Sequence, residues 1–162
     1  MNIELRPLQE ADLDTLVGFL HDPSVARWWG VPRDDAALRD DLRNGDAEAF
    51  AIVVDGELAG WLGSWEEREP DYRHGGLDTM LGEAFQGRGI GREALRLGAR
   101  RHVEERGHHR ITIDPALANT RAIRCYEAVG FRPVGVTRRS ERAPDGTWED
   151  GLLMELLAED LA

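Results

Sequence analysis

The sequence predicts a mixed α/β fold, in which one sheet carries helices on both faces. Two observations support this prediction. Short apolar runs bounded by turn residues alternate with longer stretches in which apolar residues recur every three or four positions, as in amphipathic helices. The length of 162 residues fits one domain, which we expect to span residues 1–162.

The first half of the chain predicts a strand, two helices separated by a helical turn, and a two-strand hairpin. Ser24 is placed to cap the helical turn, and Asp55-Gly56 is a frequent two-residue hairpin turn. The expected ranges are residues 3–8 for the strand, 11–20, 24–30 and 34–43 for the helical segments, and 49–54 and 58–65 for the hairpin strands.

The second half predicts a strand, a long helix, a strand, a shorter helix and a final hairpin. In the long helix, the face expected to meet the core contains Leu95, Leu97, Ala99 and Val103, and Gly107 can end the helix. Asn119 can cap the shorter helix. The expected ranges are 77–81, 90–106, 110–114, 119–130, and 134–142 with 148–157. This order of elements fits one mixed sheet with helices on both faces.

Charge narrows the partners of the protein. There are 31 acidic residues against 20 basic ones, for a formal net charge of −11, which opposes nucleic acid binding and favours cationic partners. All the basic residues are arginine, so a phosphate-binding P-loop and lysine Schiff-base chemistry are excluded.

The sequence also predicts where the protein works. No apolar run reaches the length of a membrane span, and no signal peptide is recognisable at the N-terminus. The single cysteine, Cys125, cannot form an internal disulfide. We expect a cytoplasmic protein without membrane association, either a monomer or a homodimer.

A glycine-rich segment, "QGRGIGREAL", lies between the expected strand 77–81 and the long helix. Backbone N–H groups at such a helix start suit a phosphate or pyrophosphate, although a tight turn without a ligand would have the same spacing. A dinucleotide fingerprint requires a third glycine three residues after the second. Arg92-Glu93-Ala94 follows Gly91 here, so this alternative ranks low.

Two motifs together make a more specific resemblance. Gln86 to Gly91 resembles the Gln/Arg-x-x-Gly-x-Gly/Ala signature of the GNAT superfamily of N-acetyltransferases, and "NTRAIRCYEAVGF" resembles its second signature. The resemblance implies the GNAT fold, whose central mixed sheet is mostly antiparallel and has helices on both faces. It also implies acetyl-coenzyme A in a cleft where strand 77–81 splays from strand 110–114. Main-chain groups would hold the pantetheine arm, and glycine-loop amides the pyrophosphate. The implied cofactor-binding residues are Met80, Leu81, Gln86, Gly87, Arg88, Gly89, Ile90, Gly91, Arg92 and Asn119.

The catalytic residues follow from a narrower resemblance. "RWWG", "GLDTML", "IDPALANTRAIRCYEAVGF" and "PDG" together are similar to aminoglycoside 6'-N-acetyltransferases. This similarity implies Asp78 as the base and Tyr126 as the acid that protonates the departing thiolate. Helical spacing alone would make Tyr126 a core residue, whereas a charge at Asp78 in a buried strand needs a partner or a function.

The same resemblance implies how a cationic acceptor is bound. Asp114 would contact an amino group, and Trp28 or Trp29 would line the pocket. The final hairpin is longer than in the relatives, and Asp145 at its turn is the expected acidic contact, with Glu149 and Asp150 left open. His108-His109 has no third ligand at metal-like spacing, so we expect a surface pair and no metal site.

Three functions remain open from the sequence. The first is transfer of acetyl to a primary amine of a cationic small molecule, above all the 6'-amine of an aminoglycoside. The second keeps this chemistry with a lysine-derived siderophore precursor or a polyamine as acceptor. The third is a coenzyme A-binding sensor without catalysis, which the presence of Asp78 and Tyr126 disfavours.

Overall fold

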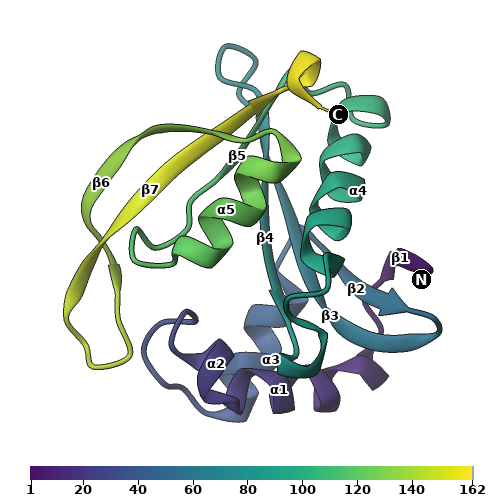
Figure 1. The fold of residues 1–162 in the computed structure, drawn as a ribbon, viewed down its shortest axis with the longest axis vertical. Coiled ribbons are helices and arrows are strands. Elements are labelled where there is room, and N and C mark those ends of the chain that lie inside the picture. The colour runs from purple at the N-terminus through teal and green to yellow at the C-terminus, as the bar shows by residue number, and fades with distance from the viewer. Residues whose placement is uncertain (162) are drawn as a thin grey trace.

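The computed structural model describes residues 1–161 and contains a seven-stranded sheet in the order β1-β2-β3-β4-β5-β7-β6 (Figure 1). All neighbouring strands are antiparallel except β4 and β5. The strands are β1 Ile3–Pro7, β2 Glu48–Val54, β3 Glu57–Glu67, β4 His74–Leu81, β5 Arg110–Ile113, β6 Arg132–Arg142 and β7 Trp148–Leu157. The helices are α1 Leu13–His21, α2 Pro23–Ala26, α3 Asp35–Arg43, α4 Ile90–Glu104 and α5 Thr120–Val129. Short 3₁₀ turns cover Glu10–Asp12, Glu83–Phe85 and Ala158–Asp160.

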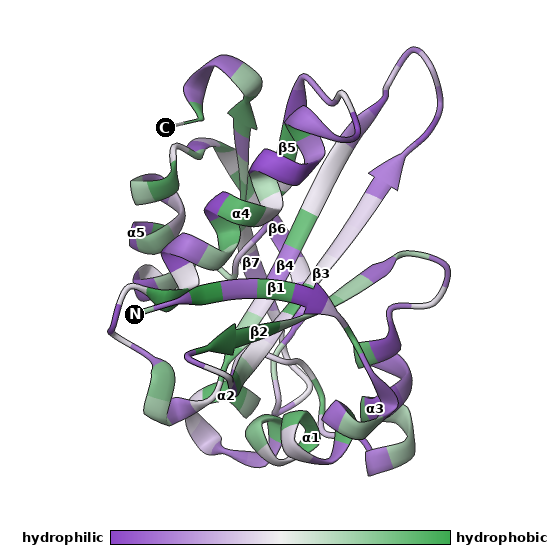
Figure 2. Cartoon of the chain, turned by 90° about the vertical axis from the view of Figure 1, so that its right-hand side faces the viewer, coloured by the Kyte–Doolittle hydropathy of each residue, from purple (hydrophilic) through white to green (hydrophobic). Residues whose placement is uncertain are grey.

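Helices cover both faces of the sheet, as the sequence predicts. Helices α4 and α5 pack on one face, where fully buried side chains such as Leu62, Leu95 and Met154 form the larger core cluster. Helices α1 to α3 pack on the other face around Leu16 and Trp61. Figure 2 shows the corresponding hydropathy, with hydrophobic residues along β2 and alternating classes along the helices. No helix in residues 1–161 is long and apolar enough to cross a membrane.

Local sequence explains most element boundaries. Asp34 caps α3 through the N–H of Ala37 at 2.8 Å, and Asn119 caps α5 through the N–H of Ala122 at 3.2 Å. The prediction that Ser24 caps the helical turn is wrong. The side chain of Asp22 caps α2, because its carboxylate accepts the N–H of Ser24 at 2.8 Å.

The buried face of α4 is the expected one except at Leu97. Leu97 is only half-buried and lies outside the main core cluster, whereas Ala94, Leu95, Gly98 and Ala99 are buried. Gly98 has Leu62 and Leu77 against its Cα, and a Cβ there would come within 3.1 Å of the Leu62 side chain. The small residues therefore decide which face of α4 approaches the sheet.

The two parallel strands separate after a short pairing. Only Gly75 with Ile111 and Gly76 with Thr112 are paired between β4 and β5. Strand β4 continues to Leu81, while β5 ends at Ile113 and the chain turns away at Pro115. One edge of β4 is thus left without a neighbouring strand, and the predicted splay is confirmed.

Candidate active site

A cavity of about 1380 Å³ lies where β4 and β5 separate. Its walls come from the end of β4, the glycine loop before α4, the start of α5, the β6–β7 hairpin and the segment that follows α2. In Figure 1 this is the region that α5 and the hairpin border on one side and α2 on the other. The cavity has two ends of different chemistry.

At the first end, the glycine loop has a conformation that side chains disfavour. Gly87 and Gly89 have φ angles of 74° and 80°, in the left-handed region, and Gly89 is the N-cap of α4. A Cβ on Gly87 would also come 2.9 Å from the guanidinium of Arg121. The loop therefore brings backbone N–H groups at the α4 start close to the cavity, which suits an anionic group.

Gln86 joins three parts of this end. Its side-chain amide donates to the carbonyl of Leu81 at 3.1 Å, and its oxygen accepts from Arg121 at 3.3 Å. The glutamine of the motif thus ties the end of β4 to the first turn of α5. Met80 and Leu81 line the cavity at this junction, as expected for residues that would contact a pantetheine arm.

Three arginines line this end of the cavity, and they are not the set that the sequence predicted. Arg92 lines the cavity, whereas the guanidinium of Arg88 lies 5.9 Å from the centre of the Phe85 ring, outside the cavity lining. Arg121 and Arg124 line the cavity and were missed. Their spacing of three residues at the start of a helix, next to the second motif, is the signal that could have found them.

Of the other expected cofactor contacts, Asn119 lines the cavity, and Ile90 does not. The side chain of Ile90 is fully buried in the core, so only its backbone N–H remains for a ligand. The Asn119 carboxamide oxygen already accepts the Ala122 N–H as the cap of α5. Its first role is therefore to start the helix that carries Tyr126.

Asp78 stands on the unpaired edge region of β4 and projects into the cavity. The side chain is exposed to the cavity, although its strand neighbours Leu77 and Met80 are buried, so its charge is not enclosed in the core. Within residues 1–161, the Asp78 carboxylate accepts one hydrogen bond, from the backbone N–H of Thr79 at 2.8 Å. Desolvation and the nearby Asp114 raise the pKa of Asp78 to about 6. A carboxylate with this pKa is ionised at neutral pH and basic enough to accept a proton.

Tyr126 faces the same cavity from α5. Its ring packs in the core against Phe131, with ring centres 6.4 Å apart, so the predicted core packing and the predicted cavity position coexist. The residue is 8% exposed. Desolvation and the neighbouring carboxylate of Asp78 raise the pKa of Tyr126 above its usual value. The phenol is thus protonated at neutral pH and can donate.

The second end of the cavity is walled by aromatic rings and by the hairpin. The guanidinium of Arg27 lies 4.2 Å from the ring centre of Trp28. Trp29 packs edge-on against Trp61, with ring centres 5.5 Å apart. Both tryptophans line the cavity. A Cβ on Gly30 would come 3.8 Å from the carbonyl oxygen of Arg142, so the segment after α2 approaches the end of β6.

Carboxylates concentrate at this second end. Asp78 and Asp114 line it from the sheet, and Glu141 and Glu149 from the hairpin. None of the four forms an ion pair among residues 1–161. Desolvation raises the pKa of Asp114, and burial with the neighbouring carboxylates raises that of Glu141 to about 7.

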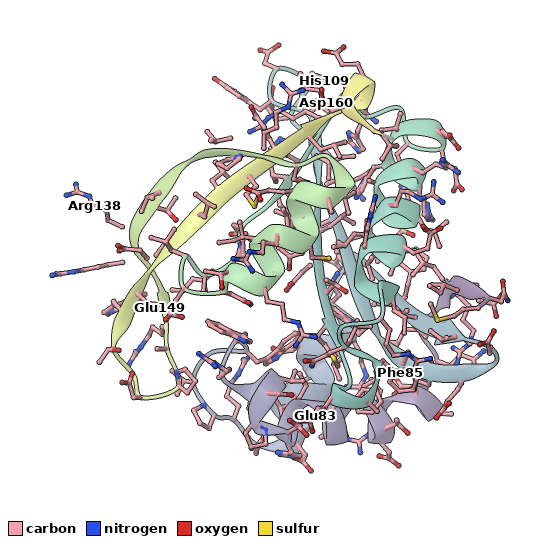
Figure 3. All side chains as sticks on the ribbon, in the orientation of Figure 1. Glu83, Phe85, His109, Arg138, Glu149 and Asp160 are labelled. Carbon is pink, nitrogen blue, oxygen red and sulfur yellow. The ribbon has the colours of Figure 1, made fainter. Side chains whose placement is uncertain are left out.

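The hairpin differs from the expectation in which acid it presents. Asp145 lies exposed in the turn, where it accepts hydrogen bonds from the N–H and hydroxyl of Thr147 at 3.0 and 2.7 Å, outside the cavity lining. Glu149 lies on β7 (Figure 3) and lines the cavity. Glu141 was missed, because no local motif marks it.

Two smaller predictions concern residues near or away from the cavity. Cys125 is half-buried at the cavity wall, and burial raises the pKa of its thiol, as expected for a packing residue rather than a nucleophile. The prediction that His108 is a surface residue is wrong. It is 2% exposed, and with His102 and Glu66 it places donor atoms within 4.8 Å of one another.

The histidine cluster lies at the opposite end of the molecule from the cavity. His109, next to it in sequence, and Asp160 mark that end in Figure 3, away from Glu83 and Phe85 after β4. His108 contacts Glu66 at 2.8 Å, and His102 contacts Ser64 at 2.8 Å. Desolvation lowers the pKa of His102 to about 4, so this ring is neutral. The cluster joins β3, α4 and the segment before β5.

Comparison with known proteins identifies the class to which this architecture belongs. The model of the acetyltransferase (GNAT) domain matches residues 2–132, so the chain belongs to the GNAT family of acetyltransferases. Solved structures of the relative AAC(6')-Ib contain acetyl-CoA or coenzyme A. The fold, the cofactor and the N-acetyltransferase class expected from the sequence are thereby confirmed.

Within the family, several relatives are named for aminoglycosides. The aminoglycoside N(6')-acetyltransferase type 1 of Klebsiella pneumoniae is 30% identical over 163 residues, which cover 90% of this chain and 79% of that protein. The structure of AAC(6')-Ib in complex with paromomycin and acetyl-CoA has a TM-score of 0.81 and 25% identity, covering 99% and 96% of the two chains. RimJ of Mycobacterium smegmatis in complex with CoA-disulfide has a TM-score of 0.86 and 26% identity, covering 98% and 83%.

Proposed function

We propose that this acetyltransferase transfers acetyl to a primary amine of a cationic small molecule, above all the 6'-amine of an aminoglycoside. The observation that carries the proposal is the pair of cavity ends. Arg92, Arg121, Arg124 and the glycine loop lie at one end. At the other end lie four carboxylates without ion pairs in residues 1–161, while Arg27 and Arg142, which also line the cavity, have their guanidinium groups over the rings of Trp28 and Trp148. Unpaired carboxylates in a partly desolvated cavity repel one another. An ammonium group bound between them would relieve this repulsion, so the acidic end should bind cationic acceptors.

The proposed reaction is direct attack. The amine nitrogen bonds to the thioester carbonyl carbon, and the carbon–sulfur bond breaks. Asp78 accepts the proton that the amine loses, since its pKa of about 6 lets it act as a base at neutral pH. The phenol of Tyr126 protonates the departing thiolate. Proton exchange with solvent through the open cavity restores both groups.

The acidic cavity also creates a difficulty that the proposed base relieves. Carboxylates attract the acceptor as an ammonium ion, yet they raise the pKa of that amine and so oppose the deprotonation that attack requires. A carboxylate whose own pKa is raised can take this proton directly or through water. This need is our physical reason for assigning the base to Asp78. A single half-buried cysteine agrees with action in the cytoplasm.

The test is release of thiol from acetyl-coenzyme A by the purified protein. Neomycin and paromomycin form the sharpest pair, because they differ only in an amine or a hydroxyl at the 6' position. Lysine derivatives and spermidine complete the panel. We expect turnover with neomycin and at least tenfold less with paromomycin. Equal rates for the two drugs would exclude the 6'-amine, and turnover only with the other amines would move the function to those acceptors.

A further inference from the structure

The short pairing between β4 and β5 lies between two side-chain rings. Gly75 and Gly76 are the residues of β4 that pair with β5. A Cβ on Gly75 would come 2.5 Å from the imidazole of His102, and a Cβ on Gly76 would overlap the indole of Trp65. Successive positions of a strand point to opposite faces, so the two rings cover β4 from opposite sides. This close approach requires glycine at both positions.

His102 reaches β4 from α4, which packs beside that strand (Figure 1). The residue is 2% exposed. Its Nε2 lies 3.2 Å from the carbonyl oxygen of Gly76 and 2.8 Å from the hydroxyl oxygen of Ser64. A carbonyl oxygen only accepts hydrogen bonds, so Nε2 carries the single proton of this neutral ring. Nδ1 then has no proton to donate, which explains why it can be buried without a partner in residues 1–161.

The histidine cluster is less suited to a metal ion. A metal at Nε2 of His102 would displace the proton that the Gly76 carbonyl accepts. The carboxylate of Glu66 already has the guanidinium groups of Arg68 and Arg106 at 3.6 Å, and these would repel a further cation. Donation to the backbone of β4 is therefore the use of His102 that fits its surroundings.

Gly76 is the point at which β4 leaves β5. Beyond it β4 continues to Leu81 without a strand on that side, and Met80 and Leu81 line the cavity. If the pairing continued in register, Asp78 would lie opposite Asp114, and two like charges would meet. A free strand edge offers unpaired N–H and C=O groups to a ligand. The place where the pairing stops thus determines which part of β4 faces the cofactor.

We propose that His102 is a positioning residue for acetyl-coenzyme A. By holding the carbonyl of Gly76, it fixes the point at which β4 separates from β5, and with it the free edge that faces the cofactor. His102 itself lies outside the cavity lining and acts through β4. The proposal goes beyond the proposed function, because it depends neither on the identity of the acceptor nor on Asp78 as the base.

The experiment measures the dissociation constant for acetyl-coenzyme A by calorimetric titration. His102→Leu has a similar volume and no donor, so we expect the constant to rise about tenfold as the Gly76 carbonyl loses its partner. His102→Gln places an amide N–H as many bonds from the backbone as Nε2, and its constant should stay within about threefold of the wild type. Turnover is not needed for either result, so a wrong acceptor does not affect the test.

His108→Leu is the matched control. It removes an imidazole of the same cluster that is also 2% exposed, but whose hydrogen bond goes to Glu66 on β3. This variant should lower the melting temperature about as much as His102→Leu does, while its dissociation constant stays within about twofold of the wild type.

Three outcomes would overturn the proposal. The first is an unchanged dissociation constant in His102→Leu. The second is an equal rise in His108→Leu, which would make His102 a core residue that only stabilises the fold. The third is an equal rise in His102→Gln, which would show that the N–H donor is not what holds β4.

A measurement on the wild type covers the case in which His102→Leu does not fold. Proton–nitrogen NMR spectra of the histidine rings at neutral pH should show His102 protonated on Nε2. A ring protonated on Nδ1 alone would overturn the proposal, because its Nε2 could not donate to the Gly76 carbonyl. His102→Asn then replaces the leucine variant, since its shorter amide does not reach that carbonyl, and equal affinities of the Asn and Gln variants would also overturn the proposal.

Discussion

The two ends of the cavity are built in different ways. The cofactor end consists mainly of neighbours in sequence, since Gln86 to Arg92 supply the loop, the helix start and an arginine. The acceptor end takes its carboxylates from four strands or strand ends, at Asp78, Asp114, Glu141 and Glu149. The cofactor end therefore depends on backbone N–H groups whose positions are set by the local conformation of the chain. The acceptor end depends on side chains that come together only when strands distant in sequence are placed next to one another. Variants at one end should therefore leave the function of the other end intact.

The largest expected effect is at Asp78. Replacing it with Asn should lower turnover on the order of a hundredfold or more, because the amine loses its proton acceptor. In the wild type, kcat/KM should fall as the pH drops through about 6, where Asp78 becomes protonated, and this step should vanish in the variant. Steady-state thiol release over pH 5 to 9 measures both.

The control for Asp78→Asn is the other end of the cavity. Calorimetric titration should give the same dissociation constant for acetyl-coenzyme A in the variant and the wild type. Turnover within fivefold of the wild type would remove Asp78 as the base, and a large loss of cofactor affinity would show that the two ends are not independent.

A smaller effect is expected at the proposed acid. Tyr126→Phe keeps the ring that packs against Phe131 and removes only the hydroxyl. We expect roughly a ten- to hundredfold loss of kcat, because water in the open cavity can partly replace the phenol as proton donor. An acetyl thioester whose leaving thiol is more acidic needs less protonation as it departs, so such a substrate should restore much of the kcat lost in the variant. No change in kcat at any pH would leave Tyr126 as a core residue alone.

The cofactor end can be perturbed through its backbone. Gly89→Ala places a side chain at a φ angle of 80°, which costs about 1–2 kcal/mol and should raise the dissociation constant for acetyl-coenzyme A by about tenfold. The KM for the amine should not change. Gly18→Ala is the matched control, since Gly18 lies in α1 with no atom within 4 Å of an added Cβ. An equal shift in the amine KM of Gly89→Ala would contradict the separation.

The smallest effect is on stability. The folded-state pKa of Asp78 is about 6, above the ordinary value of 3.8, so the folded chain binds more protons than the unfolded chain between these values. The contribution of Asp78 to the free energy of unfolding is therefore greatest at low pH and falls as the pH rises through about 6. Asp78→Asn should raise the unfolding free energy at pH 7.5 by about 1 kcal/mol, a value reduced because the carboxylate faces an open cavity.

Thermal unfolding checks this last prediction. For a chain of this size the melting temperature should rise by about 2–4 °C at pH 7.5 and by little at pH 4. A variant that is less stable at pH 7.5 would show that the Asp78 charge is compensated in the fold.

The sequence predicted correctly those features that depend on residues close together along the chain. The element order, the Asp55-Gly56 turn and the Asn119 cap followed from local patterns, and the structure confirms them. The cap of α2 was misplaced by two residues, because Asp22 and Ser24 are both good caps and pattern alone does not separate them. Leu97 was misassigned because Gly98 and Ala99 allow a closer approach of α4 than a leucine would.

The sequence by itself determined the class of protein and the cofactor end, because left-handed glycines followed by a helix start are a local property of the chain. Tertiary structure alone decided which carboxylates meet at the acceptor end. Asp145 and Glu141 lie four residues apart on one hairpin, yet only Glu141 lines the cavity. The physical reason is position in the hairpin. Glu141 rejoins β7 after a bulge in β6, and strand register sets the face of its side chain, whereas Asp145 lies beyond the end of β6 in a turn where Thr147 holds its carboxylate.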